Sequence, residues 1–108
     1  MKRDNLINQS LLLELLFYES DSGRLIWKKR NVKYFSSLNE CVVWNNRYAG
    51  KDAGGLDKRG GITLKIFDKS MSAARIAYLY HYGTIPDKKL TYKNKNKTDL
   101  RIDNLIFL

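Results

Sequence analysis

The first apolar segment of the chain covers residues 11–17 and follows a polar stretch, residues 1–9, that we expect to be flexible. Its leucines recur at the spacing that places side chains on one face of a helix. Ser10 precedes the segment, and its hydroxyl can cap the first turn. We therefore predict a short helix whose apolar stripe consists of Leu12, Leu15 and Leu16.

A turn and a strand are expected next. Residues 21–23 (Asp-Ser-Gly) favour a turn, and residues 24–28 are rich in side chains with high strand propensity. The periodicity weakens over residues 30–47, so we predict an irregular connection there. Its candidate anchors to the core are Val42, Val43 and Trp44.

Glycines then mark out an antiparallel meander. Residues 50–56 are expected to be extended, residues 57–61 to form a turn, residues 62–67 a strand, and residues 68–70 a second turn. Apolar and polar side chains alternate in the strand, which is typical of a strand with one buried face. The buried face is predicted to consist of Ile62, Leu64 and Ile66.

A helix is predicted over residues 73–82, because apolar side chains recur there at helical spacing. Gly83 can end this helix, and Pro86 a few residues later is compatible with a helix end. The inward stripe should contain Ile76, Leu79 and Tyr80, and a second face should contain Arg75, Tyr78 and Tyr82.

The last part of the chain has weaker signals. Residues 89–93 can form one short strand, and residues 94–97 can form a loop. Thr98 or Asp99 can then cap a final helical turn that runs to Asn104.

Together these elements predict an α+β fold in one domain covering residues 1–108, with a small antiparallel sheet and a few short helices packed against it. Because 44% of the residues are hydrophobic, the chain can bury one small core. No run approaches the roughly 18 consecutive apolar residues of a membrane span. Residues 11–17 contain Glu14 and no cleavage site follows them, so a signal peptide is not expected either. We expect a soluble intracellular protein.

The net charge of the chain is the composition feature that says most about its function. It has 20 lysines and arginines against 11 aspartates and glutamates, which leaves a formal net charge of +9. A surplus of this size in a small domain is typical of proteins that bind polyanions. Nucleic acid fits better than a membrane surface, because no predicted helix combines a basic face with a wide apolar one. A basic protein that is merely soluble is the alternative.

Several motifs then occur in a specific order. Residues 47–54 are Arg-Tyr-Ala-Gly-Lys-Asp-Ala-Gly, residues 73–83 are Ala-Ala-Arg-Ile-Ala-Tyr-Leu-Tyr-His-Tyr-Gly, and residues 98–105 are Thr-Asp-Leu-Arg-Ile-Asp-Asn-Leu. Their order and spacing resemble the HNH endonucleases of the phage homing type. Residues 18–28, with their turn and their Leu-Ile-Trp-Lys strand, resemble the N-terminal part of that family, so the resemblance covers most of the chain outside residues 31–44.

The resemblance implies a C-terminal ββα unit around one divalent metal, with an Asp and an Asn as ligands and a His as the base that activates water. The family's Asp falls on Thr91, its general-base His on Tyr92, and the His before its helix arginine on Ala74; only the Asn persists, as Asn104. Threonine is a weak neutral ligand, and a phenol with a reference pKa of about 10 keeps its proton at neutral pH. The resemblance therefore implies a nuclease that has lost its cutting residues, with neither a metal nor a cofactor.

Few other residues could restore a metal site. The single cysteine, Cys41, and the single histidine, His81, cannot build a zinc site of the usual kind. Cys41 is better explained as a buried apolar residue, and His81 as a residue of the helix surface about two turns beyond the lost histidine. Asp99 and Asp103 lie near the surviving asparagine and could bind a metal weakly, although Asp99 is better explained as a helix cap.

A basic run covers residues 88–97, where five lysines stand in ten residues without an acidic one. Lysines in place of the acidic pair of an active nuclease remove a cation site and favour an anion such as the phosphate backbone. A solvated loop is the alternative. Nearby tyrosines could stack on exposed bases or belong to the core. The predicted nucleic-acid contacts are Arg75, Tyr78, Lys88, Lys89, Tyr92, Lys93, Lys95, Lys97 and Arg101.

These observations predict a catalytically inactive nucleic-acid-binding protein, encoded by a phage and acting on double-stranded DNA in the cytoplasm of a bacterial host. One alternative is an inhibitor of a host-defence nucleoprotein, of the anti-CRISPR or anti-restriction type, that binds its target protein. The other is a divergent metal-dependent nickase. Neither a membrane nor a small-molecule substrate is expected as a partner.

Overall fold

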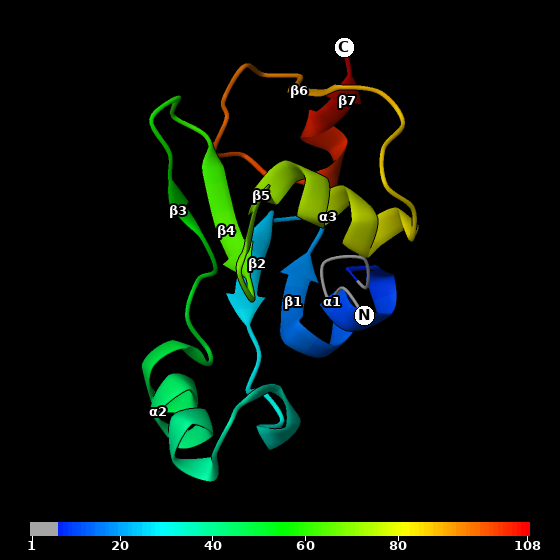
Figure 1. Cartoon of the computed structure of the whole chain (residues 1–108). Helices are drawn as coiled ribbons and strands as arrows, with labels where there is room; N and C mark the ends of the chain where they lie inside the picture. The colour runs from blue at the N-terminus through cyan, green and yellow to red at the C-terminus, as the bar shows by residue number, and fades with distance from the viewer. Residues whose placement is uncertain (1–6) are drawn as a thin grey trace.

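A computed structural model describes residues 7–108 of the chain. Residues 1–6, which belong to the stretch expected to be flexible, lie outside the described residues. The described part has an α+β fold of short helices and small antiparallel sheets, as predicted (Figure 1). None of its helices has both the length and the apolar character needed to cross a membrane.

The helices and strands follow one another in short segments, with η marking a 3-10 helix. They are α1 (Gln9–Leu15), β1 (Leu16–Glu19), β2 (Arg24–Trp27), η2 (Val32–Tyr34), α2 (Leu38–Tyr48), β3 (Gly55–Leu56), β4 (Ile62–Ile66), β5 (Lys69–Ser72), α3 (Ala73–Tyr82), β6 (Leu90–Tyr92), η3 (Ile102–Asn104) and β7 (Leu105–Phe107). The strands pair as β1–β2, β3–β4–β5 and β6–β7, each pair antiparallel.

Helix α3 occupies the centre of the molecule. It packs against α1, β4, β5 and η3, and it lies between the β6–β7 hairpin on one side and α1 with β1 on the other (Figure 1). The predicted stripe of α1 is fully buried, and so is Ile76 of α3, because these faces meet in the core. Helix α2 lies at the opposite end from β6 and β7 (Figure 1).

The prediction for α1 needs two corrections. Asn8, not Ser10, caps this helix, since its side-chain oxygen accepts a hydrogen bond from the backbone N–H of Leu11 (3.0 Å). The helix also ends at Leu15, earlier than predicted. Leu16 and Phe17 are extended because they pair with Trp27 and Ile26 of β2, and this pairing is not visible in the local helical pattern.

The irregular connection predicted for residues 30–47 is wrong, since this stretch contains η2 and most of α2. The hydroxyl of Ser37 accepts from the backbone N–H of Glu40 (3.2 Å) and thereby caps α2. A Ser-x-x-Glu sequence is a known signal for a helix start. Val42 and Val43 are exposed and do not anchor the helix, whereas Trp44 packs against the core as predicted and Cys41 is buried as expected.

The meander was predicted better. Strand β4 coincides with residues 62–66 of the predicted strand, with Leu64 and Ile66 buried. Residues 67–68 form a tight turn, and β5 begins at Lys69, where only a turn was expected. The extended stretch expected over residues 50–56 is reduced to β3 and an isolated bridge between Asp52 and Ile26.

Helix α3 matches its prediction in both bounds, and Gly83 ends it in the left-handed conformation at φ 82°. The final helical turn exists as η3, but neither Thr98 nor Asp99 caps it with a side chain; its N-cap is Arg101. Strand β7 was not predicted, because a strand of three residues is defined by its partner β6 rather than by its own pattern.

The C-terminal segment is docked onto the β1–β2 hairpin. The hydroxyl of Tyr18 donates a hydrogen bond to the carbonyl of Leu100, and the N–H of Ile102 donates to the carbonyl of Ser20 (3.0 Å). Leu100 is buried in the core. These contacts join the β1–β2 hairpin to the segment between β6 and β7.

The docking explains why Gly23 stands at the tip of that hairpin. A Cβ at this position would lie 2.6 Å from the N of Arg101 and 2.8 Å from the carbonyl carbon of Leu100, and φ is +80°. We expect Gly23→Ala to lower the free energy of unfolding by about 2–5 kcal/mol, from backbone strain and overpacking together. Urea unfolding measures this loss.

The matched control is Gly60→Ala. Gly60 has nearly the same φ, +86°, but nothing lies within 4 Å of its Cβ position. This variant should therefore show only the strain, about 1–2 kcal/mol. If both variants lose the same free energy of unfolding, the close approach of Gly23 to residues 100 and 101 does not contribute to the effect of Gly23→Ala.

Candidate nucleic-acid interface

A pocket of about 570 Å³ lies where α3, β6 and the β3–β4 turn meet. We call it the α3–β6 pocket. Three of the positions at which the resemblance places catalytic residues line it together, namely Ala74, Thr91 and Tyr92. Its lining consists of Asp57, Arg59, Gly61, Ser72, Ala74, Arg75, Lys89, Leu90, Thr91, Tyr92, Lys97 and Leu108.

Local structure explains this meeting. Ala74 is the second residue of α3 and is buried, so the first turn of the helix forms one wall. Thr91 and Tyr92 belong to β6 and pair with Ile106 and Leu105 of β7, which fixes the position of the strand beside the helix. The pocket thus combines a helix start with a strand more than ten residues away in sequence.

Asn104 does not line the α3–β6 pocket. It is 3% exposed, its Oδ1 accepts from the N–H of Asn94 (2.9 Å), and its Nδ2 donates to the carbonyl of Asp99 (2.9 Å). Both ends of its side-chain amide are therefore engaged by the backbone of the loop that follows β6. The asparagine therefore stabilises the conformation of this loop. Of the four positions that the resemblance singled out, only Ala74, Thr91 and Tyr92 lie together in the pocket.

We expect Asn104→Ala to lower the free energy of unfolding by about 1–3 kcal/mol, because the part-buried N–H of Asn94 and carbonyl of Asp99 lose their partners. Chemical denaturation measures the loss, and hydrogen exchange should become faster at the Asn94 amide. Asn46→Ala, on the exposed side of α2, is the control and should stay within about 0.5 kcal/mol of the parent. A similar small effect of Asn104→Ala would contradict a role in holding the loop.

The α3–β6 pocket is electropositive. Its charged side chains are Arg59, Arg75, Lys89 and Lys97 against the single carboxylate of Asp57. Lys97 is held in place, because its Nζ donates to the carbonyl of Arg59 (3.1 Å). Across residues 7–108, no three His, Cys, Asp or Glu side chains come together in a group that could hold a metal ion.

Asp57 and Arg59 were not among the predicted site residues. One carboxylate oxygen of Asp57, Oδ1, accepts from the N–H groups of Arg59 (2.8 Å) and Gly61 (3.1 Å) and so shapes the β3–β4 turn. The sequence did predict this turn, and binding residues often lie on surface loops. Its position beside β6 depends on the fold of the sheet.

Tyr92 is a poor candidate for a base in this setting. Burial raises the pKa of its phenol above the ordinary value; a hydrogen bond with Ser72 opposes this effect, and the negative charge of Asp57 adds to it. The phenol therefore stays protonated at neutral pH and can donate a hydrogen bond to an anion. The half-buried Thr91 has a neutral hydroxyl that can do the same.

The other residues of the basic run lie outside this pocket. Lys88, Lys93 and Lys95 are exposed, and Lys93 lines a smaller pocket of about 370 Å³ with Asn104. Arg101 lies there too and pairs with Asp99 (2.8 Å). The Arg101 guanidinium lowers the pKa of the Asp99 carboxyl to about 2. Asp99 is thus an ion-pair partner.

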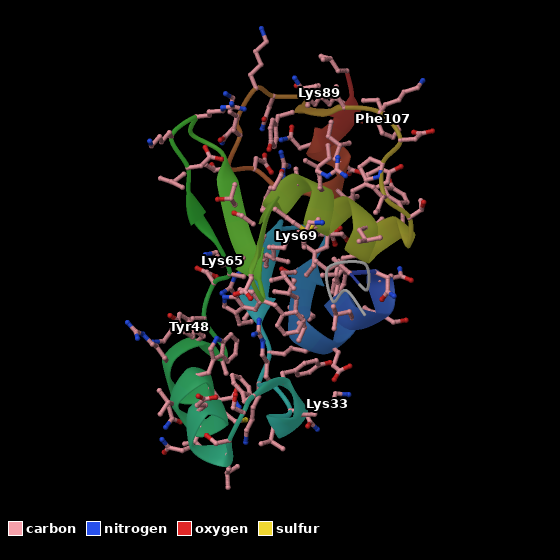
Figure 2. The ribbon with its side chains drawn as sticks, viewed as in Figure 1. Lys33, Tyr48, Lys65, Lys69, Lys89 and Phe107 are labelled. Carbon is pink, nitrogen blue, oxygen red and sulfur yellow. The ribbon has the colours of Figure 1, made fainter. Side chains whose placement is uncertain are left out.

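An aromatic cluster lies next to these charges. The ring of Tyr78 is 4.6 Å from that of Tyr82 and 5.7 Å from that of Phe107, and Tyr82 and Phe107 are exposed. Figure 2 shows Phe107 and Lys89 at the same end of the molecule. His81 is exposed beside Tyr82 and does not line the α3–β6 pocket, as expected from its spacing.

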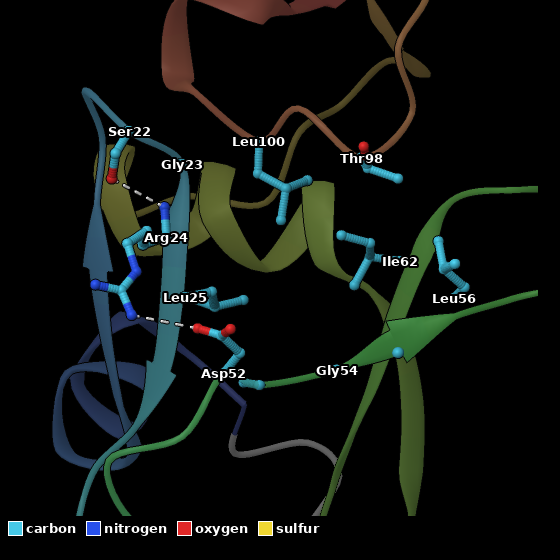
Figure 3. A pocket seen from close by; sticks show the side chains of 12 residues that line it. Ser22, Gly23, Arg24, Leu25, Asp52, Gly54, Leu56, Ile62, Thr98 and Leu100 are labelled. Carbon is cyan, nitrogen blue, oxygen red and sulfur yellow. Dashed lines mark hydrogen bonds and ion pairs between the residues drawn. The ribbon is translucent and has the colours of Figure 1, made fainter.

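A different pocket, of about 460 Å³, lies between the β1–β2 hairpin and β3 (Figure 3). Its walls are largely apolar, with Leu25, Ile62 and Leu100 pointing into it (Figure 3). The charged side chains in its lining, Arg24 and Asp52, pair with each other at 3.5 Å. This pocket therefore offers no charged group without a partner.

Comparison with known proteins gives one match, which covers the C-terminal third of the chain. Neither the curated proteins nor the solved structures include a match to this chain. Residues 73–108, however, match the HNH endonuclease family. This segment runs from α3 to the last residue and contains all four positions that the resemblance singled out, including Ala74 and Asn104. The C-terminal part of the chain is therefore similar to HNH endonucleases.

Proposed function

We propose that this chain binds double-stranded DNA at the α3–β6 pocket and does not cut it. The observation that carries the proposal is the charge of the pocket: four cationic side chains and one carboxylate surround the positions of Ala74, Thr91 and Tyr92. The match of residues 73–108 to HNH endonucleases supports nucleic acid as the ligand class.

The electrostatics favour an anion over a cation. A divalent metal is favoured by several anionic or imidazole ligands, and the pocket offers one side-chain carboxylate among four positive charges. A phosphate is attracted by the same charges, and arginine can hold it with two parallel hydrogen bonds. Contacts of this kind hold the protein on the backbone of DNA and carry no sequence information. The site residues we propose are Arg59, Arg75, Lys89, Thr91, Tyr92 and Lys97.

The remaining predicted contacts, Tyr78, Lys88, Lys93, Lys95 and Arg101, would extend this surface along the loop after β6 and onto the aromatic cluster. A phage-encoded protein of this type would act in the cytoplasm of its host. An inhibitor of a host-defence nucleoprotein would use the same basic surface, and it differs in binding a protein rather than free DNA.

A divergent nickase is the second candidate, and Asp57 favours it. Its Oδ1 is engaged by the turn, but no described residue donates a hydrogen bond to Oδ2. One metal could bind there beside Thr91. Arg59 and Lys97 would oppose that metal, which is why we place this function second.

A titration and a cleavage assay together test the proposal. A labelled duplex is titrated at several salt concentrations, and supercoiled plasmid is incubated with magnesium or manganese. We expect binding that weakens steeply with salt, with a log–log slope beyond about −3 if several side chains contact phosphates. We expect no nicking.

Each rival predicts a different outcome. Nicking that Asp57→Asn abolishes would establish the nickase. Failure to bind duplex DNA at low salt would reject the proposal and favour the protein inhibitor. Capture of a nucleoprotein complex by this chain would then test that function.

A further inference from the structure

Arg30 has an environment unlike that of the surface lysines. Its side chain is 8% exposed, and its guanidinium lies 4.0 Å from the ring centre of Trp44 and 5.0 Å from that of Trp27. The backbone is fixed by Asn45, whose Oδ1 accepts from the N–H of Arg30 (2.8 Å) and whose Nδ2 donates to its carbonyl (3.0 Å). The ring of Phe67 lies 5.4 Å away. Three separate elements thus hold this side chain in place.

The aromatic rings satisfy only part of what a buried guanidinium requires. Aromatic faces attract the positive charge, but the five N–H groups at the edge of the guanidinium need acceptors. Within residues 7–108, Nε of Arg30 has no hydrogen-bond partner and no carboxylate forms an ion pair with the side chain. Burial lowers its pKa to about 10. A buried cation without an anion is costly, so this edge is suited to an anionic ligand.

Arg30 lines a pocket of about 440 Å³, which we call the Arg30 pocket. Trp44, Tyr48 and Lys65 also line it, and no acidic side chain does. Figure 2 shows Tyr48 and Lys65 on the same side of the molecule, beside α2 and β4. The pocket therefore combines a fixed planar donor, an exposed ammonium and aromatic walls.

We propose that the Arg30 pocket binds a phosphate group, with the guanidinium edge of Arg30 as a bidentate donor and Lys65 as a second cation. A planar fork of N–H groups matches the geometry of phosphate oxygens. The site is separate from the α3–β6 pocket, and nucleic acid as the source of the phosphate rests on the proposed function.

The β3–β4 hairpin connects the two pockets. Gly61 lines the α3–β6 pocket and Phe67 lines the Arg30 pocket, at the two ends of β4. At about 3.3 Å per residue these positions are roughly 20 Å apart. Duplex DNA covers that length in about six base pairs, so a duplex that lies along β4 is long enough to contact both pockets. This continuity with the first site favours DNA over the acidic side chains of a protein partner.

The chain contains its own reporter for this site. It has two tryptophans, Trp27 and Trp44, and both lie against Arg30. We would follow their indole N–H signals by NMR while adding a short duplex, inorganic phosphate or polyglutamate at constant ionic strength. We expect both signals to shift saturably with duplex and with phosphate. If the signals shift with polyglutamate alone, the proposal is overturned in favour of a protein partner. If they shift with none of the three ligands, Arg30 has a purely structural role and the proposal is also overturned.

Two variants provide an independent measurement. Arg30→Met removes the charge but keeps an apolar chain of similar length for the rings, and Arg24→Met makes the same exchange at an exposed arginine. For Arg30→Met we expect the Kd for duplex to rise about tenfold or more and the salt slope to become shallower by about 0.9. Arg24→Met should stay within about twofold of the parent.

The melting temperature separates binding from folding. If the uncompensated cation is costly, Arg30→Met should melt at or above the temperature of the parent. A lower melting temperature with unchanged DNA affinity would show that Arg30 serves only the fold. If the parent binds no duplex at all, the proposed function fails, and the phosphate titration of the indole signals still decides whether the Arg30 pocket binds phosphate.

Discussion

Arg75→Glu combined with Lys89→Glu should weaken binding to duplex DNA at least about a hundredfold at moderate salt. Each residue lines the α3–β6 pocket from a different segment, Arg75 from α3 and Lys89 from the residue just before β6. A charge-assisted hydrogen bond is worth about 1.5–3 kcal/mol, and reversal adds repulsion to the loss of two such bonds. The log–log salt slope should become shallower by about 1.8, since two phosphates are no longer neutralised.

The control is a second double variant that changes the net charge by the same amount at two residues outside the pocket. Arg24 and Lys33 are exposed and form surface ion pairs with Asp52 and Glu14, which contribute little to stability. Figure 2 shows Lys33 and Lys89 at opposite ends of the molecule. Arg24→Glu with Lys33→Glu should weaken binding only a few-fold, through the long-range field. Equal losses in the two double variants would mean that the α3–β6 pocket is not the DNA-binding surface.

The second large effect should follow from restoring the lost ligands. Ala74→His, Thr91→Asp and Tyr92→His together place two imidazoles and a carboxylate in a pocket that already contains Asp57. These groups suit a divalent transition metal, whereas the present side chains do not. At manganese about 100-fold above its Kd, the folded state should gain about 2.7 kcal/mol. In a chain of this size that is a rise of about 10 °C or more in melting temperature.

The structure changes two details of this experiment. Asn104 is not expected to join the restored site, because its amide is used by the loop after β6. The cations that oppose the metal are Arg59 and Lys97, which line the pocket, whereas Lys93 and Lys95 of the basic run do not line it. The triple variant in a Lys97→Gln background should therefore bind manganese more tightly than the triple variant alone. A folded triple variant with no manganese-dependent stabilisation would contradict the placement of the three positions around one site.

Local sequence determined those parts of the fold whose causes are local. Helix α3 was predicted in both bounds because its apolar residues recur at helical spacing and Gly83 can adopt a left-handed conformation at its end. Strand β4 was predicted from the alternation of Leu64 and Ile66 with polar neighbours. Helix α2 was missed because it buries little beyond Cys41, so apolar periodicity is weak, although Ser37 and Glu40 carried a capping signal.

Pairing partners and distant neighbours were decided by the tertiary structure alone. Strands β5 and β7 are short segments that become strands through β4 and β6, and their own residues give little indication of it. The α3–β6 pocket illustrates the same point for function. The family resemblance identified Ala74, Thr91, Tyr92 and Asn104 as a group. Only the fold places Asp57 and Arg59 beside the first three and Asn104 outside their pocket.

Arg30 gives the physical reason most clearly. In the sequence it is one of 20 basic residues and has no feature that sets it apart. Its burial depends on Trp27, Trp44 and Phe67, which come from a strand, a helix and a turn that approach one another only in the folded chain. The cost of a buried charge is a property of its surroundings rather than of its residue type, and therefore only the tertiary structure could reveal it.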